Sequence, residues 1–156
     1  YAPPAAKVED IVRQKASPTL WNPNAAANWS LLFSPAFGAF VHMKNWQALG
    51  EPAKVASAKV WAILSLVVIV GLSCVGALLP ASKGLNDATR SLGLVLLLSW
   101  YFASGRAQAE YVKERFGKSY PRKGWGKPLL FGLLVLFSFF VVVSVLGVVA
   151  GALGRV

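Results

Sequence analysis

Two glutamates, Glu110 and Glu114, are spaced by one helical turn, and a pair of carboxyl groups at that spacing can supply a general acid and a general base. Their neighbours favour a different interpretation. Arg106 lies one turn before Glu110, and Lys113 and Arg115 flank Glu114, which is typical of a solvated, salt-bridged helix face. We therefore expect no catalytic carboxylate pair in this segment.

Other residue types that carry out chemistry are scarce. His42 is the only histidine and has no carboxylate near it in the sequence, so we expect an interfacial side chain rather than a metal ligand or proton carrier. Cys74 is the only cysteine, which excludes an intrachain disulfide. The sequence contains no nucleophile elbow, phosphate-binding loop or zinc-protease motif. It predicts a protein that is not an enzyme and needs no cofactor or metal.

The hydrophobic pattern is more informative than these polar residues. Residues 129–153 form an uncharged run of 25 residues, longer as a helix than the hydrocarbon layer of about 30 Å. Residues 60–79 form a second uncharged run. A third run, 92–103, reaches a spanning length only if its helix includes Asp87 and Arg90, which can pair on one face near the interface. We expect transmembrane helices over 53–79, 85–116 and 127–154.

The segment 22–50 is apolar and aromatic, but Pro35 and Gly38 interrupt it. Proline kinks or ends a helix, and the bracketing residues Trp29 and Trp46 are of the type that prefers the headgroup level. We expect a kinked helix that lies in the interface or re-enters and returns. The alternative is a fourth transmembrane helix.

The basic residues indicate an orientation in the membrane. The formal net charge is +10, which in a soluble protein would suggest a nucleic acid. Here the basic residues lie beside hydrophobic segments, so we expect anionic lipid headgroups as partners and no nucleic acid. Residues 105–128 hold seven basic side chains and residues 79–91 hold two. Because basic loops stay inside, we expect 105–128 to be cytoplasmic and the C-terminus to be outside.

Three sets of residues are candidate contact sites. Small residues that allow close helix packing, within the bundle or between protomers, are Gly147 and Gly151, in a GxxxG pattern, with Ser73, Gly76 and Ala77. Residues expected to contact lipid headgroups or an acidic partner are Arg115, Lys118, Arg122, Lys123, Trp125 and Lys127. The expected interfacial anchors are Trp29, Trp46 and Tyr120.

The stretch 22–52, NPNAAANWSLLFSPAFGAFVHMKNWQALGEP, resembles a module of small uncharacterised bacterial inner-membrane proteins. In those proteins an aromatic NW…LF.P.FGA…NW segment precedes a transmembrane hairpin. The resemblance covers the N-terminal half of the chain. It implies a multi-pass protein of the bacterial inner membrane and implies no activity.

The sequence therefore predicts an all-α fold with a polar tether over 1–21 and a single helical membrane domain over 22–156. We expect a non-catalytic protein that acts through protein–protein or protein–lipid contacts, as a subunit, an adaptor or an immunity-type protein, or as a homo-oligomer. The alternative is a small oligomeric channel or carrier lined by small residues and serines. A lipid-modifying enzyme ranks third, because no nucleophile or carboxylate pair is available for it.

Overall fold

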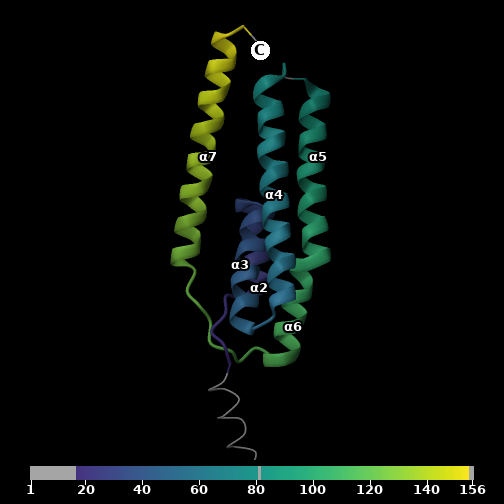
Figure 1. Ribbon diagram of the computed structural model, residues 1–156, viewed down its shortest axis with the longest axis vertical. Coiled ribbons are helices and arrows are strands. Elements are labelled where there is room, and N and C mark those ends of the chain that lie inside the picture. The colour runs from purple at the N-terminus through teal and green to yellow at the C-terminus, as the bar shows by residue number, and fades with distance from the viewer. Residues whose placement is uncertain (1–16, 81, 155–156) are drawn as a thin grey trace, which may run out of the picture.

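The computed structural model describes residues 17–80 and 82–154, and within these ranges it contains helices and no strand (Figure 1). The all-α fold class is therefore confirmed. Most of the expected tether, 1–21, lies outside the described residues. The elements are α2 (Pro23–Phe33), α3 (Pro35–Leu49), α4 (Pro52–Leu78), α5 (Lys83–Trp100), the π-helical turn η1 (Tyr101–Gly105), α6 (Arg106–Phe116) and α7 (Gly126–Ala152).

The segment expected to be one kinked helix, 22–50, consists of two helices. Asn22 caps α2 by accepting hydrogen bonds from the first backbone N–H groups, and Pro23 occupies the first turn. The chain breaks at Ser34, whose φ of 101° lies in a region that non-glycine residues rarely adopt. Pro35 then starts α3, which ends at the left-handed Gly50. Pro35 accounts for the break, because proline disfavours a helical conformation in the residue before it.

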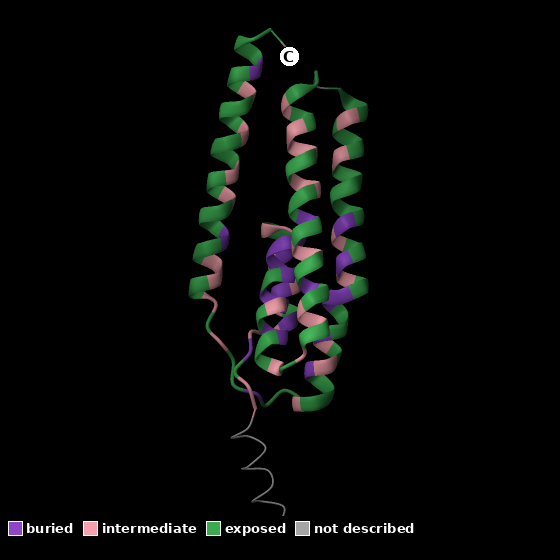
Figure 2. Ribbon diagram, in the orientation of Figure 1, coloured by how far each residue is buried: buried purple, intermediate pink, exposed green. Residues whose placement is uncertain are grey.

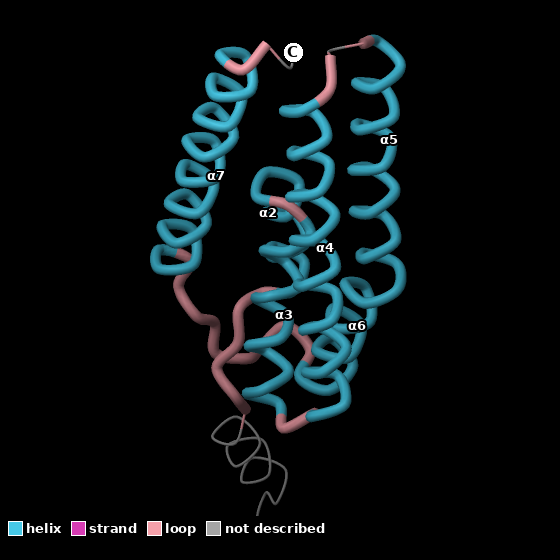
Figure 3. The backbone as a smooth tube through the Cα atoms, turned by 45° about the horizontal axis from the view of Figure 1, so that its top comes forward, coloured by secondary structure: helices cyan, strands magenta, loops and turns pink. Residues whose placement is uncertain are grey.

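The helices α2 and α3 form an antiparallel hairpin with its turn at Ser34. The Pro23 carbonyl oxygen, at the start of α2, lies 3.2 Å from His42 Nε2, in the second half of α3. The Trp21 N–H donates to Asn45 Oδ1 at 3.0 Å. Both ends of the hairpin therefore lie at the same end of the molecule, and the turn between α2 and α3, its tip, lies beside the middle of the long helices (Figure 3). We call the region around Trp21 and Asn45 the hairpin base.

Three long helical rods surround this hairpin. The helices α4 and α7 have 27 residues each, about 40 Å of helix. The third rod consists of α5, η1 and α6 in direct succession. At η1 the hydrogen bonding changes to the wider π pattern, and Trp100, Ser104 and Gly105 are buried there. The turn after α4 and the end of α7 lie opposite the hairpin base (Figure 1).

Among the described helices, α4 and α7 are long and apolar enough to cross a membrane. In the most apolar 18-residue stretch of each helix, only 6% of the residues are buried (Figure 2). The helix α5 does not share this character over its whole length, because its first two turns contain Lys83, Asp87 and Arg90. The buried residues concentrate instead around the hairpin and α6. Side chains of the hairpin thus form the protein core, and the long helices present apolar side chains outward.

Candidate functional site

A network of buried polar side chains joins three segments at the hairpin base. Asn45 Nδ2 donates to the Trp21 carbonyl oxygen at 2.8 Å and to Gln108 Oε1 at 3.1 Å, while Asn45 Oδ1 accepts from the Trp21 N–H. Gln108 Nε2 donates to the His42 carbonyl oxygen at 2.9 Å. Asn45 and Gln108 are both fully buried. The network holds the chain before α2, the helix α3 and the helix α6 together, and we call it the base network.

His42 lies beside this network and is completely buried, so its assignment as an interfacial side chain is wrong. Its ring centre is 5.5 Å from that of Trp100. Burial lowers the pKa of the His42 imidazole, and the contact with the Pro23 carbonyl raises it by less. A neutral ring that donates from Nε2 to Pro23 fits this environment. His42 Nδ1 and Trp100 Nε1 are buried without a hydrogen-bond partner among the described residues.

A second polar group ties the turn between α3 and α4 to α6. The Tyr111 hydroxyl donates to Glu51 Oε1 at 2.6 Å and accepts from the Arg115 guanidinium. The bond to Glu51 is the main reason that the pKa of Tyr111 is raised. The Lys54 ammonium lies 4.7 Å from the ring centres of both Trp46 and Tyr111. These contacts fix α6 against the start of α4.

Two of the three expected interfacial anchors are instead packed inside the protein. Trp46 is 2% exposed and its ring meets that of Tyr111 edge-on at 5.0 Å. Tyr120 is 9% exposed and packs with Leu20 and Val112, and this burial raises its pKa. Only Trp29 keeps a partly exposed position, 6.1 Å from the ring of Phe33. Trp46 and Tyr120 are therefore core residues.

The basic stretch lies at the hairpin base, in and around the loop between α6 and α7. Backbone bonds join Leu20 to Pro121 at 3.0 Å and to Lys123 at 2.9 Å, and the Trp21 indole donates to the Gly124 carbonyl oxygen at 3.0 Å. The structure brings the predicted contact residues to one end of the molecule. Lys123 and Trp125 are partly buried. The other contact residues are exposed: Arg115, Lys118, Arg122 and Lys127.

The expected salt-bridged face of α6 is confirmed at its start. Arg106 Nε lies 2.7 Å from Glu110 Oε1, and both side chains are more than half exposed. Glu114 is also exposed, so the carboxylates lie on a solvated surface and not in a cleft.

The glycines singled out in the sequence have open surroundings among the described residues. A Cβ atom at Gly147, Gly151 or Gly76 would meet no atom within 4 Å. The Ser73 hydroxyl donates to the Ile69 carbonyl oxygen of its own helix at 2.7 Å. Ala77 is partly buried. Packing of these residues between protomers stays a prediction.

The closely packed glycines lie elsewhere, and sequence reasoning missed them. A Cβ atom at Gly38 would lie 2.0 Å from Ser30 Oγ and 2.4 Å from Trp100 Cη2. One at Gly132 would lie 3.1 Å from a ring carbon of Phe37. The hairpin therefore touches both α5 and α7 at glycines. At Gly38 the only sequence signal was a glycine among aromatic residues, which we interpreted as a helix breaker.

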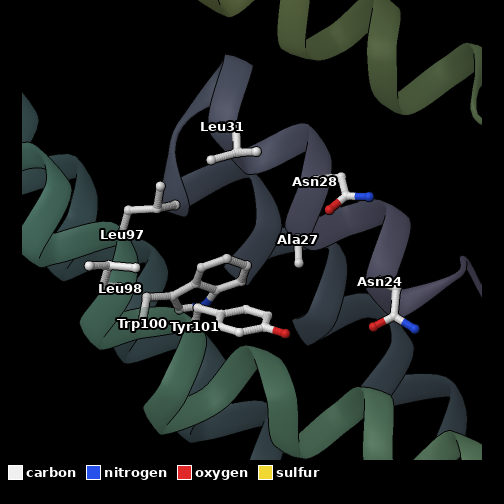
Figure 4. A pocket seen from close by; sticks show the side chains of 8 residues that line it. All are labelled: Asn24, Ala27, Asn28, Leu31, Leu97, Leu98, Trp100 and Tyr101. Atoms are coloured by element: carbon white, nitrogen blue, oxygen red, sulfur yellow. The ribbon is translucent and has the colours of Figure 1, made fainter.

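Two cavities adjoin the hairpin. The larger, of about 720 Å³, lies between the hairpin tip and the helices α4, α5 and α7, and its lining is almost entirely aliphatic and phenylalanine side chains. The smaller, of about 210 Å³, lies between α2 and the end of α5 (Figure 4). Asn24 and Asn28 line one side of the smaller cavity, and Trp100 and Tyr101 line the other.

No family model, curated protein or solved structure matches this chain. Among the described residues, no group of three or more His, Cys, Asp or Glu side chains is placed to hold a metal ion. The fold, the base network and the large cavity are therefore the observations from which a function can be argued.

Proposed function

We propose that this chain is a multi-pass protein of the bacterial inner membrane whose work is non-catalytic contact with lipids or with a partner protein. Three helical rods would span the bilayer, and the α2–α3 hairpin would re-enter it from the cytoplasmic side. The loop 105–128 would be cytoplasmic and the C-terminus periplasmic. A subunit, an adaptor or an immunity-type protein would have this character.

The observation that carries the proposal is the exposure of apolar side chains along α4 and α7. Phe137, for example, is 68% exposed in the middle of α7. Soluble proteins rarely leave contiguous apolar surfaces of more than a few hundred Å² uncovered. A helix with apolar residues on all sides suits the hydrocarbon of a bilayer.

The helix α5 is the proposed third span, although its first turns are polar. Beyond those turns four of its apolar side chains are exposed as well: Leu92, Leu94, Val95 and Leu98, with Leu94 at 57%. Asp87 and Arg90 lie near the end opposite the hairpin base, where long side chains can reach the headgroups. The rod becomes strongly polar again only in α6.

Two features support re-entry of the hairpin over a fourth span. The bonds between Trp21 and Asn45 hold both ends of the segment at one end of the molecule. That end also carries α6 and the basic loop, which the positive-inside rule assigns to the cytoplasm. The tip at Ser34 lines a cavity with Leu66 of α4 and Val135 of α7, both within uncharged runs.

The polar groups support a structural role rather than catalysis. Asn45 and Gln108 form hydrogen bonds with one another and with the backbone, which is the arrangement that buried polar groups need for stability.

The resemblance of 22–52 to bacterial inner-membrane modules agrees with the proposed location.

Alkaline carbonate extraction of bacterial membranes that contain the full chain tests this proposal. We expect the chain to stay in the membrane pellet and to float with the lipid in a density gradient, because its apolar helices need hydrocarbon around them. A peripheral protein held by charge in the same membranes serves as the control and should be released. Release of this chain together with that control would reject the membrane-spanning proposal.

A further inference from the structure

The large cavity has the volume and lining of a site for a hydrocarbon chain. Its volume of about 720 Å³ lies within the range of about 300–1,000 Å³ typical of ligand sites. Its polar side chains are Ser30 and Ser34, and the Ser30 hydroxyl already donates to the Ala26 carbonyl oxygen at 2.9 Å. Ordered water needs two to four polar partners, so an apolar occupant fits this space better than water.

An aromatic pair borders the cavity toward the hairpin base. Phe40 of α3 and Phe131 of α7 both line it, and their rings stack with centres 6.2 Å apart. Residues four apart on a helix are neighbours on its surface. Lys44 is therefore one turn from Phe40, and Lys127 is one turn from Phe131.

Both lysines lie on the base side of the aromatic pair. The helix α3 runs toward the base and α7 runs away from it, so Lys44 follows Phe40 and Lys127 precedes Phe131. The Lys44 ammonium is 5.6 Å from the Phe40 ring centre. Both lysine residues are exposed, and no carboxylate lies within ion-pair distance of either among the described residues. Two unpaired positive charges thus flank the base side of an apolar cavity.

We infer that this cavity holds one acyl chain of an anionic phospholipid from the surrounding bilayer and that Lys44 and Lys127 bind its phosphate. The charges match the ligand, because a phosphate lies at headgroup depth while its acyl chain enters the hydrocarbon. The ammonium group of lysine is a compact binder of phosphate. The inference rests on the proposed membrane location and adds to it a specific lipid site.

Native mass spectrometry of the full chain, taken up in mild detergent from vesicles of equal phosphatidylglycerol and phosphatidylcholine, tests the inference. We expect one retained phosphatidylglycerol. The double variant Lys44→Gln/Lys127→Gln should lower the preference for phosphatidylglycerol about tenfold. The control Lys59→Gln/Lys113→Gln removes the same charge from exposed positions on α4 and α6 and should keep the preference.

A second pair of variants tests the cavity itself. Gly93 lines it and has no atom within 4 Å of a Cβ position, so the ring of Gly93→Phe has room to enter and should abolish lipid retention. Gly84 has the same open surroundings on the same helix and does not line the cavity. The control Gly84→Phe should therefore keep the lipid.

Any of the following results would overturn the inference. Equal retention of both lipids, or an unchanged preference in Lys44→Gln/Lys127→Gln, would exclude a phosphate site at these lysines. Retention in Gly93→Phe would exclude the acyl chain from the cavity. A lipid-free dimer whose interface covers the cavity would assign it to a second copy of the chain. If the chain resists carbonate extraction but retains no lipid, only this inference fails, whereas release by carbonate rejects the membrane location first.

Discussion

Replacing Gly38 with alanine is expected to lower the free energy of unfolding by about 3 kcal/mol, the upper part of the usual range for overpacking. The added Cβ would lie 2.0 Å from Ser30 Oγ and 2.4 Å from Trp100 Cη2. Neither neighbour can move easily. The Ser30 hydroxyl is bonded to the Ala26 carbonyl oxygen, and Trp100 is completely buried.

Unfolding in mild detergent, titrated with a denaturing detergent and followed by tryptophan fluorescence, measures this change. The matched controls are Gly71→Ala and Gly147→Ala, at helical glycines with open surroundings. Alanine favours a helix over glycine by about 1 kcal/mol, so the controls should be unchanged or more stable. A Gly38→Ala variant as stable as the parent would show that the hairpin does not pack against α5 in this way.

Replacing Asn45 with leucine is expected to lower the free energy of unfolding by at least about 3 kcal/mol. Leucine has a similar size but leaves three partly or fully buried groups without their partner. These are the Trp21 N–H, the Trp21 carbonyl oxygen and Gln108 Oε1. An unsatisfied buried group costs about 1–3 kcal/mol, and the three groups belong to two separate segments.

The control for this change is Gln47→Leu, two residues further along α3 at an exposed position. It should alter stability by no more than about 0.5 kcal/mol. A double-mutant cycle with Gln108→Leu adds a second criterion. Because Asn45 and Gln108 share a bond, the two losses should fall short of additivity by about 0.5–3 kcal/mol. Strict additivity would mean that the base network does not act as a unit.

Local sequence patterns predicted the helices well because the causes are local. The uncharged runs correspond to α4 and α7, and the expected segment 22–50 begins at the cap of α2 and ends at the cap of α3. Each depends on residues within a few positions of one another. The break at Ser34 follows from Pro35 in the same way, although we expected a kink rather than two helices.

The interior of the hairpin was not predictable from those patterns. In an aromatic segment, side chains that face lipid and side chains that face protein are both apolar, so periodicity does not separate them. His42 and Trp46 therefore looked interfacial and are buried. Gln108 lies in a charged helix, and no local pattern marks it as buried, because its partners are 63 and 66 residues away in the chain. Close packing at Gly38 likewise depends on Trp100, which no local pattern relates to it.

Cysteine labelling in intact bacterial cells tests the re-entrant architecture most directly. Single cysteines at Asn24, Gln47, Ser119 and Asn86, all exposed positions, would be introduced into a chain that carries Cys74→Ala. They would be treated with a membrane-impermeant thiol reagent before and after permeabilisation. We predict that the cysteine at Asn86 reacts in intact cells, and that those at Asn24, Gln47 and Ser119 react only after permeabilisation. Reaction of Asn24→Cys and Gln47→Cys from opposite sides would show that the segment spans the membrane and would contradict the account.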